Sequence, residues 1–285
     1  MCIRDSIDDA VALAYLVSQP RCELLGVTTV TGEPQRRAEM ASAICRNVGA
    51  GDVPVHAGCP EAMLIEMRQK VAQQAAALGE WDRRRDFPAN TAVEFLRQTI
   101  RAHPGEVTLL AVGPMTNLGL LFATDPEIPS LLAQVVLMCG RFFSRMSGEW
   151  NAIGDPHATA IVYGNGRQTR PPRHLSHGLD VTTQCRMPAD ACRKRFTAKA
   201  LEPVRDFAEV FFQRSETITF HDPLAAASIF QPDLCRYRQG KVTVSLAPPT
   251  MGWTVFAEST DDAPHTVAAE VDAERFFEHY FDVVK

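Results

Sequence analysis

Short apolar segments alternate with longer amphipathic segments along most of this chain, and this alternation restricts the fold more than any other feature. Residues 106–112 and 134–138 are mainly apolar, as expected for strands buried on both faces of a sheet. Residues 34–48 place Ala38, Ala41 and Ile44 on one face of a helix, which Gly49 ends. Strands that alternate with helices predict an α/β fold: a doubly wound, mostly parallel sheet flanked by helices.

The other segments extend this prediction to the whole chain. Further strands are expected at 23–30 and 53–57, further helices at 10–17, 91–103, after 113–117, from 155 to 163 and at 200–214, and a β-rich end at 241–244 and 253–256. Thr91 and Glu94 fit a capping box at a helix start. Residues 60–90 are polar and irregular, which predicts a loop or a mobile insertion. Because no internal repeat or linker is visible, we expect a single domain over residues 1–285.

Composition excludes several classes of protein. The formal net charge of −5 argues against a nucleic-acid partner, which usually requires a basic surface. No apolar run approaches the roughly 20 residues that cross a membrane. The eight cysteines are scattered without a C-x-x-C pair, so disulfide frameworks and zinc sites are disfavoured. Reduced, buried thiols are expected, as in a cytoplasmic protein.

Two acidic patches, Asp8-Asp9 and His221-Asp222, lie far apart in the sequence, and each opens an apolar segment. One acid is enough to cap a helix, and adjacent acids repel each other unless a positive charge is near. If folding brings the patches together, their carboxylates predict a hard-cation site or an acid/base pair. The alternative is that they only cap two helices.

Other polar residues fall in the loops that follow predicted strands, where ligands bind in sheets of this kind. Glu149 and Asn151 alternate with Trp150, so in an extended loop both side chains would point towards the hydroxyls of a sugar. Residues 113–117 turn the chain after a strand and can expose backbone carbonyls to a calcium ion. His221 could donate a proton to a leaving group. The alternatives are a solvated loop at 149–151, a simple tight turn at 113–117 and a structural role for His221.

Together these segments resemble the inosine-uridine nucleoside hydrolase family over nearly the whole chain. The resemblance rests on five segments: Ile7-Asp8-Asp9-Ala10, residues 27–32 (V-T-T-V-T-G), residues 112–117 (V-G-P-M-T-N), Glu149-Trp150-Asn151 with Asp155-Pro156, and His221-Asp222. It implies hydrolysis of the N-glycosidic bond between ribose and a nucleobase, with a bound Ca²⁺ ion. A nucleoside is then the expected substrate, and a homodimer or homotetramer the expected assembly.

The resemblance also implies roles for individual residues. Asp9 and Asp222 would bind calcium through their carboxylates, and Thr116 through its backbone carbonyl. The ribose hydroxyls would be held by four residues: Asp8, Glu149, Asn151 and Asp222. Asp222 would therefore bind both the metal and the sugar. Glu33, where many family members carry Asn, is a further substrate-binding candidate. His221 matches the histidine associated with protonation of the leaving base and is the predicted catalytic residue.

The first residues depart from the family pattern. Cys2 and Arg4 stand where the family carries aspartates, including the one assigned as general base and metal ligand. Residues 1–6 also lack the apolar first strand, so we expect a truncated or artefactual start. The alternative function is therefore a non-catalytic nucleoside- or ribose-binding homologue that has lost this base. A hydrolase of another glycosidic or amide substrate on the same scaffold is a second alternative.

Overall fold

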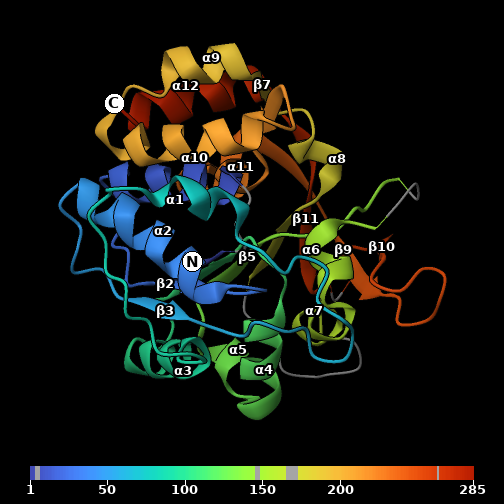
Figure 1. Ribbon diagram of the computed structural model, residues 1–285. Coiled ribbons are helices and arrows are strands. Elements are labelled where there is room, and N and C mark those ends of the chain that lie inside the picture. The colour runs from blue at the N-terminus through green and yellow to red at the C-terminus, as the bar shows by residue number, and fades with distance from the viewer. Residues whose placement is uncertain (4–6, 145–147, 165–172, 262) are drawn as a thin grey trace.

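A nine-stranded sheet with helices on both faces organises the molecule (Figure 1). The structure, a computed structural model, describes residues 1–3, 7–144, 148–164, 173–261 and 263–285. The strands follow the order β10-β9-β11-β6-β5-β4-β1-β2-β3. All neighbours from β11 to β3 are parallel, whereas β9 is antiparallel to both β10 and β11. The predicted fold class, a doubly wound and mostly parallel sheet, is confirmed.

The strands of this sheet are β1 (Cys2–Ile3), β2 (Val27–Thr29), β3 (Val55–Ala57), β4 (Thr108–Ala111), β5 (Gln134–Met138), β6 (His174–His177), β9 (Cys235–Val244), β10 (Thr254–Glu258) and β11 (His265–Val271). A separate antiparallel pair comprises β7 (Arg186–Pro188) and β8 (Thr217–Thr219). The helices are α1 (Ile7–Ser18), α2 (Pro34–Asn47), α3 (Ala92–Ala102), α4 (Thr116–Thr124), α5 (Ile128–Leu131), α6 (Trp150–Gly154), α7 (Pro156–Val162), α8 (Leu179–Thr182), α9 (Ala189–Arg195), α10 (Glu202–Phe212), α11 (His221–Phe230) and α12 (Ala273–Val283). Three short 3-10 helices are η1 (Gln73–Leu78), η2 (Lys199–Leu201) and η3 (Pro232–Leu234).

Each face of the sheet has its own hydrophobic core. Side chains alternate along a strand, so Leu110 of β4 packs into the core beneath α1, α2, α10, α11 and α12, while Leu109 packs against α3, α4 and α7. Figure 1 shows these two helical layers above and below the sheet. The helix after β1 lies in one layer and the helix after β4 in the other, although β1 and β4 are neighbours. Ligands of doubly wound sheets bind at such a switch point, beyond the carboxyl ends of the strands.

Several elements differ from the sequence predictions. A strand does form before residue 7: β1 pairs in parallel with both β2 and β4 at the centre of the sheet. The strand predicted at 23–30 is ordered as a strand only over Val27–Thr29. Thr91 precedes α3 without capping it, because its hydroxyl contacts His56 Nδ1 at 3.0 Å instead. Within the described residues, no helix is both long and apolar enough to span a membrane.

The segment 60–90 is irregular apart from η1, as the predicted loop requires, and it packs against the rest of the domain. It contains η1, whose Leu78 is buried in the core beside α10 and α2. Arg83 forms an ion pair with Glu39 of α2 at 2.8 Å, with both side chains largely shielded from solvent. The indole of Trp81 donates a hydrogen bond to Asp206 of α10. Polar composition therefore reflects long-range side-chain pairing in this segment.

Candidate active site

The two acidic patches meet where the N-termini of α1 and α11 converge. Asp8, Asp9 and Asp222 can each offer a carboxylate oxygen such that the three oxygens lie within 4.8 Å of one another. All three side chains are buried, at 5%, 1% and 1% exposure. The backbone N–H of Asp222 donates to Asp8 Oδ2 at 3.3 Å, which joins the two helix starts directly.

The local sequence explains how two helices can approach so closely at this point. α11 contains three consecutive alanines, Ala225 to Ala227, and all are fully buried. α1 is buried from Ile7 to Leu16 and packs against α11 along its length. Small side chains reduce the distance between packed helices. The positive ends of both helix dipoles then face the same cluster of carboxylates, which they stabilise.

These carboxylates fit a divalent cation. Like charges at such separations repel each other, and burial removes the water that would otherwise screen them. Carboxylate oxygens from several chain segments are the ligands that hard cations prefer. An aspartate cluster that could bind a metal ion is thus present, as the sequence predicted, whereas the individual assignments of Asp8, Asp9 and Asp222 remain predictions.

His221 is the first residue of α11 and is half-buried beside the cluster. Its Nδ1 contacts the Thr182 hydroxyl of α8 at 2.7 Å. This contact fixes the orientation of the imidazole ring. Thr182 was not among the predicted site residues, because nothing local to residue 182 in the sequence indicates a contact with residue 221.

Asn151 lies deeper in the same region and is fully buried. Its Nδ2 donates to the carbonyls of Val112 and Met138, both at 2.9 Å, at the carboxyl ends of β4 and β5. Its Oδ1 is buried and has no hydrogen-bond partner among the described residues. A buried acceptor of this kind is costly unless a ligand or water donates to it.

Glu149 supports Asn151 directly. It is the N-cap of α6, and its carboxylate accepts the backbone N–H groups of Asn151, Ala152 and Gly140 at 2.7 to 3.1 Å. The extended loop expected here is wrong, since residue 149 caps a helix and Asn151 lies inside it. Burial and the neighbouring Glu149 carboxylate hold the pKa of the Cys139 thiol well above its usual range. Cys139 is therefore a neutral packing group at neutral pH.

Thr116 and Glu33 make side-chain contacts that the sequence did not predict, and their predicted roles as metal ligand and substrate-binding residue remain predictions. Thr116 is the first residue of α4, where carbonyls point along the helix towards its C-terminus. Its hydroxyl donates to Asp155 Oδ2 at 2.8 Å. Val112 follows β4 directly and lies next to β1. Its backbone carbonyl lies at the carboxyl end of these parallel strands, and it was not among the predicted metal ligands. Glu33 is exposed, and its carboxylate accepts the backbone N–H of Ala72 at 2.8 Å.

Comparison with known proteins identifies the family. The family model "inosine-uridine preferring nucleoside hydrolase" matches residues 5–278. The chain belongs to the inosine-uridine preferring nucleoside hydrolase family. This membership confirms the predicted family and the predicted enzyme class, a nucleoside hydrolase.

Individual proteins similar to this nucleoside hydrolase support the family membership. It is 30% identical to the pyrimidine-specific ribonucleoside hydrolase RihA of Shewanella woodyi, over 95% of this chain and 92% of the relative. It is 28% identical to uridine nucleosidase 1 of Arabidopsis thaliana, over 96% of this chain and 88% of the relative. The purine-preferring ribonucleoside hydrolase from Gardnerella vaginalis has the same fold, with a TM-score of 0.85, 23% identity, and coverage of 99% of this chain and 97% of the other.

Proposed function

We propose that this nucleoside hydrolase cleaves the N-glycosidic bond of ribonucleosides with the help of one bound Ca²⁺ ion, and that the released products are ribose and a free base. The observation that carries the proposal is the buried cluster of Asp8, Asp9 and Asp222 at the switch point of the sheet. Asp9 and Asp222 would hold the cation with a backbone carbonyl, for which Val112 is better placed than Thr116. When bound, such a cation orients a water molecule and lowers the pKa of that water.

The protein's own groups then hold the sugar and the leaving base. Asp8 and Asp222 would accept hydrogen bonds from ribose hydroxyls, and the buried Oδ1 of Asn151 would accept another. Nearby carboxylates also stabilise the positive charge that develops on the sugar in an oxocarbenium-like transition state. Glu149 keeps Asn151 in position through the backbone of α6.

His221 would protonate the leaving base. The Thr182 hydroxyl holds the ring through Nδ1, so proton donation would use the opposite nitrogen, Nε2. Trp150 is 43% exposed and directly follows Glu149, which makes it a candidate to stack on the base.

A combined binding and turnover experiment tests the proposal. Ribose release from inosine, uridine and adenosine should require CaCl2 and should stop with a chelator. CaCl2 in hundredfold excess over its Kd should raise the free energy of unfolding by about 3 kcal/mol. Asp222→Asn should abolish both effects, while Asp261→Asn on the surface should keep them. The absence of any calcium effect on unfolding would contradict the metal assignment.

The same assay separates catalysis from binding alone. A non-catalytic homologue would bind ribose and still release none after Cys2→Asp and Arg4→Asp restore the family's aspartates. Turnover that appears or increases with this double substitution would identify the enzyme and its general base.

Location and assembly follow as smaller proposals. Seven of the eight cysteines are free thiols, which supports a reducing compartment such as the cytoplasm. A homodimer or homotetramer is proposed from the family resemblance, and light scattering coupled to gel filtration would measure it.

A further inference from the structure

An open pocket of about 550 Å³ lies at the carboxyl ends of three neighbouring parallel strands, β5, β6 and β11. Its lining comes from the segment after β5 (Arg141 and Phe143), from the segment after β6 (Asp180 and Thr183) and from β11 (Glu270). Figure 1 shows α8 beside β11 at this end of the sheet. Ligands of parallel sheets bind at such strand ends, which makes the pocket a candidate site.

Arg141 contributes a positive charge that the protein does not neutralise. Its Nε is buried, and its guanidinium forms no hydrogen bond or ion pair with any residue that the structure describes. Three other arginines that are likewise only partly exposed, Arg36, Arg83 and Arg97, each pair with a carboxylate. A buried donor without an acceptor is costly, and an acceptor from outside the chain would remove this cost.

The acidic groups that line the pocket are already engaged. Asp180 accepts two backbone N–H groups, one on each carboxylate oxygen, at 2.6 and 3.1 Å. Glu270 lies 3.6 Å from Arg236, with which it forms an ion pair. Neither acid pairs with Arg141. The guanidinium therefore remains available to an anion.

The backbone of Arg141 is held in place by Thr254 of β10. The Thr254 hydroxyl accepts the N–H of Arg141 and donates to its carbonyl, both at 2.9 Å. The guanidinium thus extends from a fixed point of the chain into the pocket. A group that is positioned before binding loses less conformational freedom when the ligand arrives.

An aromatic surface adjoins this cation. Phe143 is 42% exposed and packs edge to face against Phe256, with the ring centroids 5.7 Å apart. The guanidinium of Arg238, which also lines the pocket, lies over the Phe143 ring at 5.4 Å from its centroid. The pocket volume is typical of sites for small organic molecules. A ligand that combines an oxyanion with an apolar group would contact both features.

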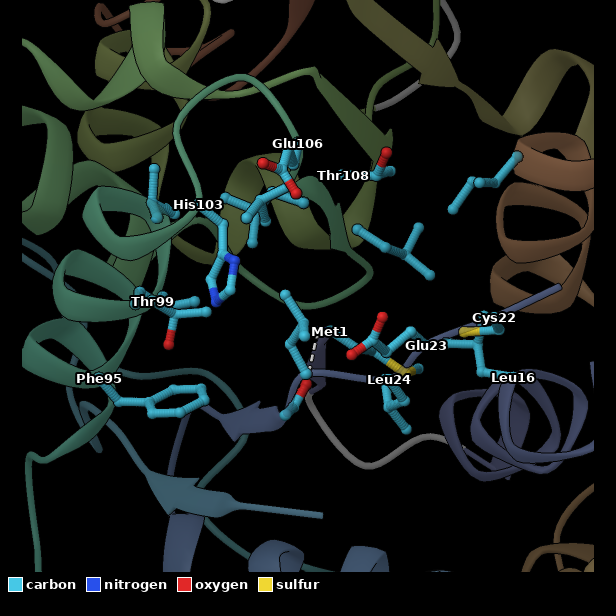
Figure 2. Close-up of a pocket in the computed structure, with 18 of the residues that line it drawn as sticks. Met1, Leu16, Cys22, Glu23, Leu24, Phe95, Thr99, His103, Glu106 and Thr108 are labelled. Carbon is cyan, nitrogen blue, oxygen red and sulfur yellow. Dashed lines mark hydrogen bonds between the residues drawn. The ribbon is translucent and has the colours of Figure 1, made fainter.

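The cavity drawn in Figure 2 lacks this combination. It lies at the amino ends of β2 and β4, and it is lined by two exposed acids, Glu23 and Glu106. Its arginine, Arg21, already donates to the Phe230 carbonyl at 2.7 Å. An anion should therefore prefer the pocket around Arg141.

We propose that the pocket around Arg141 binds a small organic anion, with a phosphate monoester or carboxylate group on the guanidinium and an apolar group against Phe143. Guanidinium groups bind both kinds of oxyanion through two parallel hydrogen bonds. The site is separate from the carboxylate cluster, although it adjoins the same short helix: Thr182 of α8 contacts His221, and Thr183 lines the pocket.

Calorimetric titrations with phenyl phosphate, benzoate, inorganic phosphate and benzyl alcohol test the site. At least one of the two aromatic anions should bind, the tighter one identifies the oxyanion, and the uncharged alcohol should not bind. Arg141→Gln should weaken this binding at least tenfold, because hydrogen bonds to charged groups contribute about that much. Phe143→Ser should weaken binding of the aromatic anion without affecting inorganic phosphate.

Two control variants accompany the titrations. Arg205→Gln, on the exposed face of α10, should leave the Kd of the aromatic anion unchanged. Asp222→Asn should also leave it unchanged, which separates this pocket from the carboxylate cluster. Failure of the parent to bind either aromatic anion, or equal binding by the parent and Arg141→Gln, would overturn the proposal.

A stability measurement needs no ligand. Arg83→Gln breaks the ion pair with Glu39 and should lower the Tm by about 2 °C or more. Arg141→Gln removes a charge that has no partner and should leave the Tm unchanged or raise it. A fall in Tm as large as that of Arg83→Gln, or a failure of Arg141→Gln to fold, would show that Arg141 is structural and would refute the site.

Discussion

Single carboxylates in this chain show what helix capping needs and what it does not. Asp272 caps α12 by accepting one backbone N–H, from Arg275 at 3.0 Å, and it does so alone and without being fully buried. α1 instead has two buried acids in its first turn, and α11 adds a third. The additional burial and charge have a cost that capping does not require. A ligand role explains this excess.

His221 provides the sharpest test at the residue scale. His221→Gln should lower kcat by about 10²- to 10³-fold while leaving the Tm close to that of the parent, because a general acid typically contributes this much. Thr182→Val, which removes the hydroxyl at Nδ1, should lower kcat by about tenfold and shift the pH profile of kcat. Steady-state kinetics with a nucleoside measures both.

The matched control is His103→Gln. His103 is exposed at the end of α3, next to the opposite edge of the sheet, and its replacement should leave kcat unchanged. Parent-like activity of His221→Gln would remove His221 from the mechanism.

At the scale of elements, Asp155 joins three segments that surround the site. It caps α7 through the N–H of Ala158 at 3.0 Å and also accepts the Met63 N–H and the Thr116 hydroxyl. It is fully buried. The starts of α4 and α7 and the segment after β3 therefore share one carboxylate.

Asp155→Ala should reduce the free energy of unfolding by about 3–5 kcal/mol, because it removes a cap and leaves two further buried donors without an acceptor. Asp272→Ala, which removes only a cap, should cost about 1 kcal/mol. Urea unfolding measures both values. Equal losses would show that the Met63 and Thr116 contacts add nothing.

Elements with strong local signals were predicted well, and elements that depend on distant partners were not. β5 has the predicted bounds, and α2 ends one residue earlier than predicted, because apolar patterns, Pro34 and Gly49 act locally. The capping box at Thr91 fails because His56 competes for the hydroxyl. Likewise, Asp8 and Asp222 meet across 214 residues, so the acidic patches alone predicted a site only on condition that folding brought them together, and the family resemblance supplied that condition.

At the scale of the whole molecule, buried histidines couple folding to pH. His177 of β6 is fully buried, and neither ring nitrogen has a hydrogen-bond partner among the described residues. Burial lowers the pKa of His177 to about 4, and it holds the pKa of His174 well below its usual range. Both rings are neutral in the folded protein at neutral pH.

The sign of the pH effect follows from this shift. The unfolded chain binds a proton at residue 177 near pH 6.5, and the folded protein does so only near pH 4. The free energy of unfolding therefore does not depend on the titration of His177 above about pH 6.5. Below that pH the unfolded chain is protonated first, and this lowers the free energy of unfolding by about 3 kcal/mol at pH 4. His177→Phe should flatten this part of the stability curve, measured by urea unfolding between pH 7 and pH 4.5. His103→Gln should keep the parent's slope, and an unchanged slope in His177→Phe would refute the assignment.

The contact between α12 and α1 joins the two ends of the chain. Tyr280 donates a hydrogen bond to the Val11 carbonyl, and His279 contacts the Tyr15 hydroxyl at 2.8 Å. The helix that carries Asp8 and Asp9 thus gains its last neighbour from a segment synthesised 269 residues later than Val11. Contacts this distant along the chain slow folding, because a long loop must close before they can form. A nascent chain released before residue 273 would lack the contacts from Tyr280 and His279, whereas α1 would keep its packing against α2, α10 and α11.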